Sequence, residues 1–227
     1  ASYHASYHAS YHSSFIWTLE SSAMRIRELL IGALVVVSPL VTTAQGTPAP
    51  KAEQIAAAVL PLPPEYRASA RVLGYGADGK LITLREGKGM ICLARDPKAP
   101  RFHVACYAES MEPFMARGRE LRAQGVTSAA EVDTVRFREV KSGKIVMPKF
   151  PAALYSLSDG DFDPKTGTAP GARHLYVVYI PYATAESTGL STKPFGNQPW
   201  IMLPGTPKAH IMFTASIDNL LNQYYRP

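Results

Sequence analysis

The two cysteines of the chain, Cys92 and Cys106, carry the clearest chemical signal in the sequence. Residues 89–94 and 102–108 are typical of two strands, and Pro97 begins a proline-containing loop that ends at Arg101. With that loop, Cys92 lies opposite Cys106 on one face of a hairpin, within reach of a disulfide bond. The two residues are too far apart for a Cys-x-x-Cys motif, so the spacing predicts a structural disulfide rather than a redox pair or a metal site.

Three histidines follow residue 44, and they are the natural candidates for acid/base work or metal binding. His103, His174 and His210 show none of the close spacings of a zinc-binding helix. The sequence also contains no Gly-x-Ser-x-Gly elbow and no obvious nucleophile beside a base. We therefore assign no catalytic residue, metal or cofactor. The alternative is a small envelope hydrolase that uses Glu86 or Glu109 with His210.

Two further segments come close to known binding loops without completing them. Residues 74–80 nearly match the Gly-x-x-x-x-Gly-Lys phosphate loop, but Leu81 stands where Ser or Thr must bind Mg²⁺, and a strand follows instead of a helix. Asp159, Asp161 and Asp163 alternate as in a calcium loop, yet prolines occupy the positions where an EF-hand needs Gly and Glu. The first segment predicts a hairpin turn. The second predicts a solvated acidic turn, with a looser calcium site as the alternative.

Four polar residues form the predicted ligand site, namely Arg85, Glu86, His174 and His210. Arg85 and Glu86 end a strand just before a glycine, His174 begins another strand, and His210 leaves a turn stiffened by proline and glycine. Binding residues concentrate where a rigid scaffold meets its loops. We expect these four groups to gather at one rim of a sheet.

The elements that must position these residues are mostly short strands. Stretches rich in Val, Ile and Tyr, bounded by turn-forming residues, predict strands at residues 71–73, 81–85, 89–94, 102–108, 152–157, 174–180, 200–203 and 210–214. Alanine-rich residues 51–60 predict a helix. A second helix is expected from Ser110, as its N-cap, to Gln124, because apolar residues recur there at helical spacing.

The segment after Ser128 supports two interpretations. Ser128 and Glu131 fit a capping box, whereas apolar residues and arginines alternate after Asp133. The alternation favours a strand, followed by a third hairpin with residues 144–147. Consecutive hairpins predict an α+β fold with a mainly antiparallel sheet of short hairpin-connected strands, and with two or three helices on one face or end.

The chain divides into three parts. Residues 1–23 repeat Ala-Ser-Tyr-His three times and precede Met24, so they read as an upstream or cloning-derived segment. Residues 24–44 have the layout of a signal peptide, with arginines, an apolar run and small residues before a cleavage site after Ala44. The apolar run is too short for a membrane anchor, which is the alternative. Residues 45–227 are then one domain without a further membrane-spanning segment.

The charge pattern argues against nucleic acid as a partner. The formal net charge is +6, which favours anionic envelope surfaces, but Lys and Arg are scattered and form no basic run. We expect a small-molecule or envelope-derived ligand instead.

Two longer segments resemble a family of uncharacterised secreted bacterial proteins. They are Thr83-Leu-Arg-Glu-Gly87, followed by the cysteine pair and a methionine-bearing helix, and Pro199-Trp-Ile-Met-Leu-Pro-Gly-Thr-Pro-Lys-Ala-His-Ile-Met212. The resemblance covers residues 81–124 and 173–213, while the proline-containing loop before Cys106 and residues 215–227 depart from the pattern. The resemblance implies export and a disulfide bond. It transfers no catalytic residue, because the family has no assigned reaction.

The expected gathering of polar groups at one rim of the sheet is the motive for a binding function. We therefore expect an exported protein, periplasmic or secreted, that acts as a ligand-binding domain. The alternatives are the small envelope hydrolase described above and an envelope structural or filament-forming protein.

Overall fold

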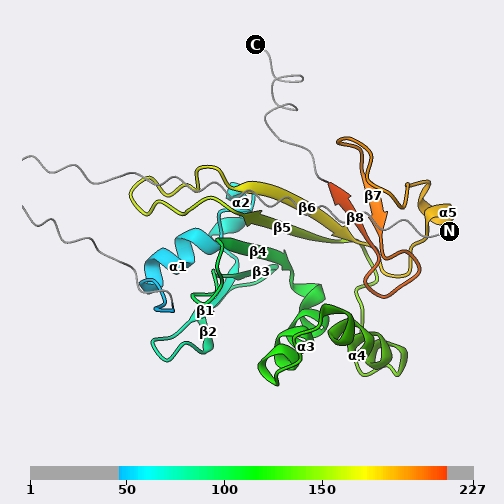
Figure 1. Ribbon diagram of the computed structural model, residues 1–227, viewed down its shortest axis with the longest axis horizontal. Coiled ribbons are helices and arrows are strands. Elements are labelled where there is room, and N and C mark those ends of the chain that lie inside the picture. The colour runs from blue at the N-terminus through cyan, green and yellow to red at the C-terminus, as the bar shows by residue number, and fades with distance from the viewer. Residues whose placement is uncertain (1–45, 214–227) are drawn as a thin grey trace, which may run out of the picture. The chain divides into compact units, whose positions relative to one another are not determined.

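The framework of the protein is one eight-stranded sheet. The computed structural model describes residues 46–213, and their strands are β1 (Arg71–Tyr75), β2 (Leu81–Arg85), β3 (Met90–Leu93), β4 (His103–Ala108), β5 (Ala152–Ser158), β6 (Arg173–Tyr179), β7 (Trp200–Met202) and β8 (His210–Phe213). The order across the sheet is β2-β1-β3-β4-β5-β6-β8-β7 (Figure 1). All neighbours are antiparallel except β1 and β3, which run parallel because β2 folds back on the outer edge of β1.

Short helices accompany the sheet. They are α1 (Lys51–Ala58), α2 (Pro64–Arg67), α3 (Glu112–Ala123), α4 (Ala129–Lys141) and α5 (Ala185–Thr188), with a 3₁₀ turn at Glu109–Met111. The alanine-rich helix and the helix before Gly125 are confirmed as α1 and α3. Within residues 46–213, no helix combines the length and the apolar character needed to cross a bilayer.

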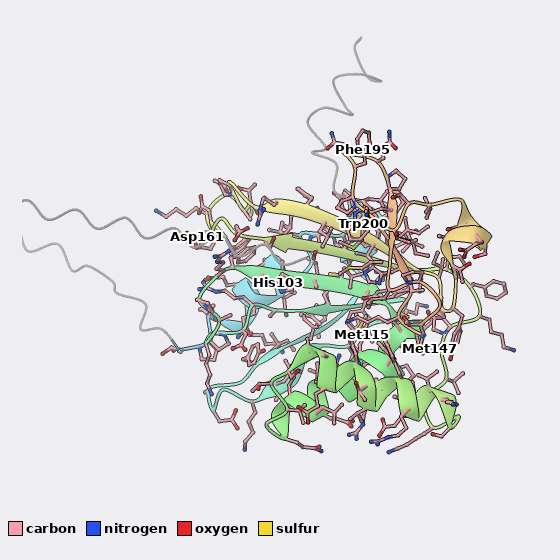
Figure 2. All side chains as sticks on the ribbon, turned by 45° about the vertical axis from the view of Figure 1, so that its right-hand side comes forward. His103, Met115, Met147, Asp161, Phe195 and Trp200 are labelled. Atoms are coloured by element: carbon pink, nitrogen blue, oxygen red, sulfur yellow. A yellow bond between two sulfur atoms is a disulfide. The ribbon has the colours of Figure 1, made fainter. Side chains whose placement is uncertain are left out.

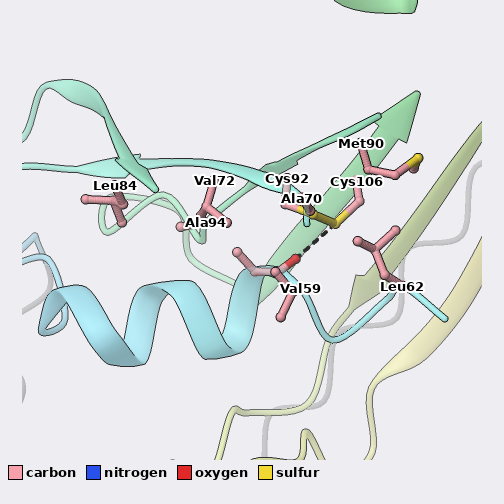
Figure 3. Packing of buried hydrophobic residues seen from close by; sticks show 10 residues of the cluster. Val59, Leu62, Ala70, Val72, Leu84, Met90, Cys92, Ala94 and Cys106 are labelled. Atoms are coloured by element: carbon pink, nitrogen blue, oxygen red, sulfur yellow. Dashed lines mark hydrogen bonds between the residues drawn. A yellow bond between two sulfur atoms is a disulfide. The ribbon is translucent and has the colours of Figure 1, made fainter. Parts of the chain in front are cut away.

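The disulfide lies in the core beneath α1. Cys92 on β3 is the register partner of Cys106 on β4, and the two are bonded with their Cα atoms 4.0 Å apart. Both are fully buried, and the Cys106 sulfur lies 3.1 Å from the carbonyl oxygen of Ala58 at the end of α1. Val59 and Leu62 pack over the same face of the sheet (Figure 3). The predicted pairing and its hairpin register are therefore confirmed.

The opposite face of the sheet carries the paired helices α3 and α4. Strand residues next to the two cysteines, such as Ile91 and Tyr107, point to the opposite face and pack against Met111 and Phe114. In Figure 1, α3 and α4 lie together on one side of the sheet. The α+β class and the mainly antiparallel sheet are confirmed. The helices divide between both faces, because β1, β3 and β4 bury large side chains on each side.

The expected strand after Asp133 and the third hairpin with residues 144–147 are wrong, since this region is helix α4. The Ser128 side chain accepts a hydrogen bond from the Glu131 backbone N–H at 3.3 Å, which is the capping interaction at its N-terminus. The buried positions of α4 are 132, 136 and 139, at helical spacing. Two of these are charged, so a pattern based on apolar residues alternating with arginines misses the buried stripe.

The start of α3 also differs from expectation. Ser110 belongs to the 3₁₀ turn, and α3 begins at Glu112 after Met111, without a side-chain cap. Pro113 in the first turn suits a position whose N–H has no helical partner. The upstream repeat, the signal peptide and the cleavage site after Ala44 lie outside the described residues.

Candidate functional site

The four residues of the predicted ligand site do not come together. Arg85 and Glu86 follow β2 at one edge of the sheet, whereas His210 is on β8, six strand positions away. Six intervals of about 4.8 Å separate these strands by about 29 Å. The expected gathering at one rim is therefore wrong, because strand order, which the local sequence does not encode, keeps the residues apart.

Arg85 and Glu86 have partners within their own corner of the fold. The Arg85 guanidinium donates to the carbonyl oxygens of Ala70, at 2.9 and 3.1 Å, and Arg67, at 2.5 Å. These bonds fasten β2 to the segment that leads from α2 into β1. Glu86 is exposed and lies 3.6 Å from Arg71. Both residues thus hold the edge of the sheet rather than face a pocket.

The two histidines of the predicted site lie on opposite faces of the sheet. His174 is exposed, and its Nδ1 is 3.0 Å from the hydroxyl of Tyr176 on the same face. His210 is only 6% exposed and pairs in register with Tyr179, whose ring centroid is 5.2 Å from the imidazole centroid. His210 Nδ1 donates to the carbonyl oxygen of Lys208 at 2.6 Å. A hydrolytic pair built on both histidines is excluded by this geometry.

A partly buried ionic cluster of Asp133, Arg136 and Lys208 lies beside His210 and was not anticipated from the sequence. Asp133 of α4 accepts from Lys208 at 2.9 Å and pairs with Arg136. Arg136 is only 4% exposed, donates to the carbonyl oxygen of Phe114 and lies with its guanidinium carbon 3.9 Å from the Phe114 ring centroid. The signal that could have revealed the cluster is the i, i+3 spacing of Asp133 and Arg136 on a helix.

The environment of this cluster sets its protonation states. Burial lowers the pKa of His210, so the imidazole stays neutral next to Lys208. Although burial opposes ionisation of Asp133, hydrogen bonds from Lys208 and Arg136 hold its pKa below the usual value. Burial raises the pKa of Tyr179 to about 12. The cluster fastens α4 to the turn before β8, and none of its members lines the pocket described next.

A pocket of about 560 Å³ lies where α1 begins. Three separate segments line it: residues 46–57, which run from the lead-in into α1, residues 95–102 of the loop between β3 and β4, and residues 161–162 of the loop between β5 and β6. The volume falls in the range typical of small-molecule sites. This pocket is the candidate functional site.

Hydrogen bonds hold the walls of the pocket in place. Gln54 is buried, and its amide donates to the carbonyl oxygens of Ala49 at 2.7 Å and Tyr75 at 2.9 Å, while its oxygen accepts from the Tyr75 N–H at 2.8 Å. The lead-in and α1 are thereby tied to β1. On the opposite wall, the Asp159 N–H donates to the carbonyl oxygen of Phe102 at 2.9 Å. The site is preformed rather than assembled from loose loops.

Close backbone contact explains why the loop beside Asp161 contains a glycine. Gly160 has φ +65°, and a Cβ at this position would lie 2.4 Å from the carbonyl oxygen of Pro170. Only glycine fits this contact without a shift of the loop. Asp161 and Phe162, which line the pocket, therefore directly follow a turn of fixed conformation.

The lining combines apolar walls with a few charges. Proline, alanine and phenylalanine make up much of it, and Phe102 is buried within a cluster that also contains Ala57. Three lining residues are charged: Glu53, Arg95 and Asp161. Among the described residues that line the pocket there is no serine, cysteine or histidine. The arrangement suits binding of a small ligand.

The aspartates whose spacing resembles a calcium loop make separate hydrogen bonds and do not converge on one point. Asp159 accepts from Arg101 and Arg173, and Asp163 accepts from the Lys165 N–H at 2.9 Å. Within residues 46–213, no group of three or more His, Cys, Asp or Glu side chains could hold a metal ion. The segment between β5 and β6 is held by arginines and by its own turn.

Comparisons with known proteins do not add to this picture: no family model matches the chain, and no curated protein or solved structure is significantly similar to it.

Proposed function

We propose that this protein is an exported ligand-binding domain, periplasmic or secreted, whose site is the pocket at the start of α1. The observation that carries the proposal is a preformed cavity of about 560 Å³ with apolar walls and three charged side chains. Such a combination of apolar surface and a few convergent polar groups is typical of small-molecule sites. The site differs from the one expected from the sequence, but the class of function is the same.

The charges of the pocket define the ligand class. Arg95 suits a carboxylate or phosphate group, whereas Glu53 and Asp161 suit an ammonium group. The proline and phenylalanine walls suit an apolar portion. The ligand we propose is therefore a small zwitterion with an apolar side group, of the size of an amino acid or a short peptide.

The disulfide supports the proposed location. Disulfide bonds form and persist in oxidising compartments such as the bacterial periplasm and the extracellular space. The Cys92–Cys106 bond lies in the core rather than at an exposed position, which fits a structural role. Together with the signal-like layout of residues 24–44, this favours export.

Binding is favoured over the hydrolase alternative by the position of His210. That histidine, the first residue of β8, is buried against Tyr179 of β6 and bonded to the carbonyl oxygen of Lys208, and it does not line the pocket. Glu86 is exposed beside Arg71, next to the edge strand β2, and is far from His210 on β8. A hydrolytic site would need these groups within hydrogen-bond reach of one another.

The test is a thermal-shift screen of the full chain against amino acids, short peptides and their zwitterionic derivatives. A ligand present at 100 times its Kd stabilises the folded state by about 2.7 kcal/mol, which corresponds to a rise in Tm of about 5 to 10 °C for a domain of this size. The proposal fails if no compound of the class raises Tm.

Charge variants then locate the site. Isothermal titration calorimetry of a compound that raises Tm should show binding at least about tenfold weaker for Arg95→Gln, because a charge-assisted hydrogen bond is lost. Lys98→Gln is the matched control, since Lys98 is exposed in the same loop but does not line the pocket. Equal weakening by both variants would place the ligand elsewhere.

A further inference from the structure

The last residue of α4 and the loop that leads from it to β5, residues 141–151 and called the loop 141–151 below, expose two large apolar side chains. Val146 is 70% exposed and Phe150 is 79% exposed. Their neighbours point inward: Ile145 is buried, Met147 packs against the cluster beneath the sheet, and the Ile145 N–H donates to the carbonyl oxygen of Glu139 at 3.1 Å. Because the inward residues anchor the loop, the outward ones are held in the solvent.

Lysines interleave with these apolar residues. Lys141, Lys144 and Lys149 are exposed in the same loop, which contains no acidic residue. Lys144 pairs with Glu139 at 3.1 Å, and among the described residues no carboxylate lies within 4 Å of the ammonium groups of Lys141 and Lys149. The loop therefore presents an uncompensated positive charge beside its exposed apolar groups.

A third exposed large hydrophobic residue, Tyr182, lies at the same end of the sheet. Ala152 of β5 is the register partner of Tyr179 of β6, so residues just before β5 and just after β6 leave the sheet together. Tyr182 is 52% exposed and has φ +65°, a conformation uncommon for a tyrosine. Its N–H donates to the carbonyl oxygen of Thr206 at 2.9 Å, which fixes its position.

We infer that this end of the sheet, the loop 141–151 together with Tyr182, docks on an anionic lipid surface. Aromatic and apolar side chains placed among lysines match the membrane interface, where rings enter the headgroup region and ammonium groups meet lipid phosphates. Protein interfaces, by contrast, are depleted of lysine. The net charge of +6 adds long-range attraction to the same kind of surface.

This docking surface is independent of the ligand pocket. The loop 141–151 precedes the first residue of β5, whereas Asp161 of the pocket follows its last residue, Ser158. Seven residues of strand separate the two by about 23 Å. A variant of one site can therefore fail without any effect on the other.

The experiment is vesicle flotation of the full chain at low and high salt. Vesicles of phosphatidylglycerol and phosphatidylethanolamine should bind the protein, and pure phosphatidylcholine vesicles should not. The double variant Val146→Ser/Phe150→Ser should weaken binding at least about tenfold, because two side chains lose their burial. Lys149→Gln should weaken it about fivefold, from about 1 kcal/mol per lysine near an anionic surface.

Phe195→Ser is the matched control. Phe195 is 74% exposed in the loop before β7, and in Figure 2 it lies above the sheet while Met147 lies below it. Its replacement should change vesicle binding less than twofold. A Trp reporter gives a second readout: Phe150→Trp should show a blue shift in fluorescence on anionic vesicles, and Phe195→Trp should show none.

Three results would overturn the inference. They are the absence of vesicle binding by the unmodified chain, equal binding to phosphatidylcholine vesicles, and unchanged binding by the Val146→Ser/Phe150→Ser variant with its circular dichroism spectrum intact. Self-association that depends on Phe150 without vesicle binding would assign the surface to a protein partner instead. None of these results bears on ligand binding by the pocket.

Discussion

Reduction of the Cys92–Cys106 disulfide should lower the free energy of unfolding by about 3 kcal/mol. The bond closes a loop of 14 residues between β3 and β4. In the chain-entropy model, opening a loop of this length returns about 10 cal/mol/K to the unfolded chain, which is about 3 kcal/mol at 25 °C. The folded hairpin keeps its register without the bond, because α1 packs over it on one face and α3 on the other.

Removal of both sulfur atoms should lower the free energy of unfolding more than reduction does. Cys92 and Cys106 are fully buried beneath α1, so the double variant Cys92→Ala/Cys106→Ala leaves two small voids in addition to the open loop. Each void of this size costs about 1 kcal/mol. The double variant should therefore lose about 5 kcal/mol in total.

Urea unfolding followed by circular dichroism, with and without a phosphine reductant, measures both quantities. The reduced protein should unfold at a lower urea concentration than the oxidised protein, and the double alanine variant at a still lower one. Because the variant has no thiols, it also serves as the control for side effects of the reductant. Oxidised and reduced proteins that differ by less than about 1 kcal/mol would refute the reasoning, since the chain-entropy term alone exceeds that value.

Four further substitutions and one change of pH test the account of the fold. Asp133→Ala should destabilise the fold by about 3 to 5 kcal/mol in urea unfolding, because Arg136 loses its partner in a buried position. Since burial lowers the pKa of His210, stability should be complete above about pH 6.5 and fall at lower pH, and His210→Gln should flatten that change in the urea midpoint. Gly74→Ala should lower the free energy of unfolding by about 2 kcal/mol, because the new Cβ would lie 2.4 Å from a side-chain atom of Leu84. Gly79→Asn should change it by less than about 0.5 kcal/mol, because Asn tolerates φ +72° and no atom lies within 4 Å of a Cβ at this position.

The parts of the fold that the sequence predicts are those fixed by local chemistry. Eight of the predicted strands overlap an observed one, whereas the two expected after Asp133 and at residues 144–147 do not. The disulfide register follows from the loop beginning at Pro97, because a hairpin with a fixed loop has a fixed register. The end of α3 follows from Gly125, whose φ is +91°.

Features that depend on distant contacts could not be predicted in this way. The buried stripe of α4 includes Arg136 and Glu139, and both depend on contacts with α3: Arg117 pairs with Glu139, and Arg136 donates to the carbonyl oxygen of Phe114 in addition to its pair with Asp133. The parallel pairing of β1 with β3 and the place of β2 at the edge are set by strand order. That order places Arg85 and Glu86 far across the sheet from His210.

The pocket could not be recognised from the sequence for the same reason. Its walls come from three segments, and each one alone has an ordinary structural interpretation: a proline-containing lead-in, a loop inside a hairpin and an acidic turn. One of the segments contains Gln54, a buried polar side chain that bonds to both the lead-in and β1. A polar residue on the buried side of an alanine-rich helix is a signal that could have drawn attention to this end of α1.

Chemical-shift mapping of the ¹⁵N-labelled protein during titration with a zwitterionic compound that raises its Tm tests the central claim most directly. We predict shifts concentrated at residues 46–57, 95–102 and 161–162, with a saturable dependence on ligand concentration. Shifts concentrated instead around Asp133, Lys208 and His210 would contradict the account, because they would place the ligand at the ionic cluster rather than in the pocket.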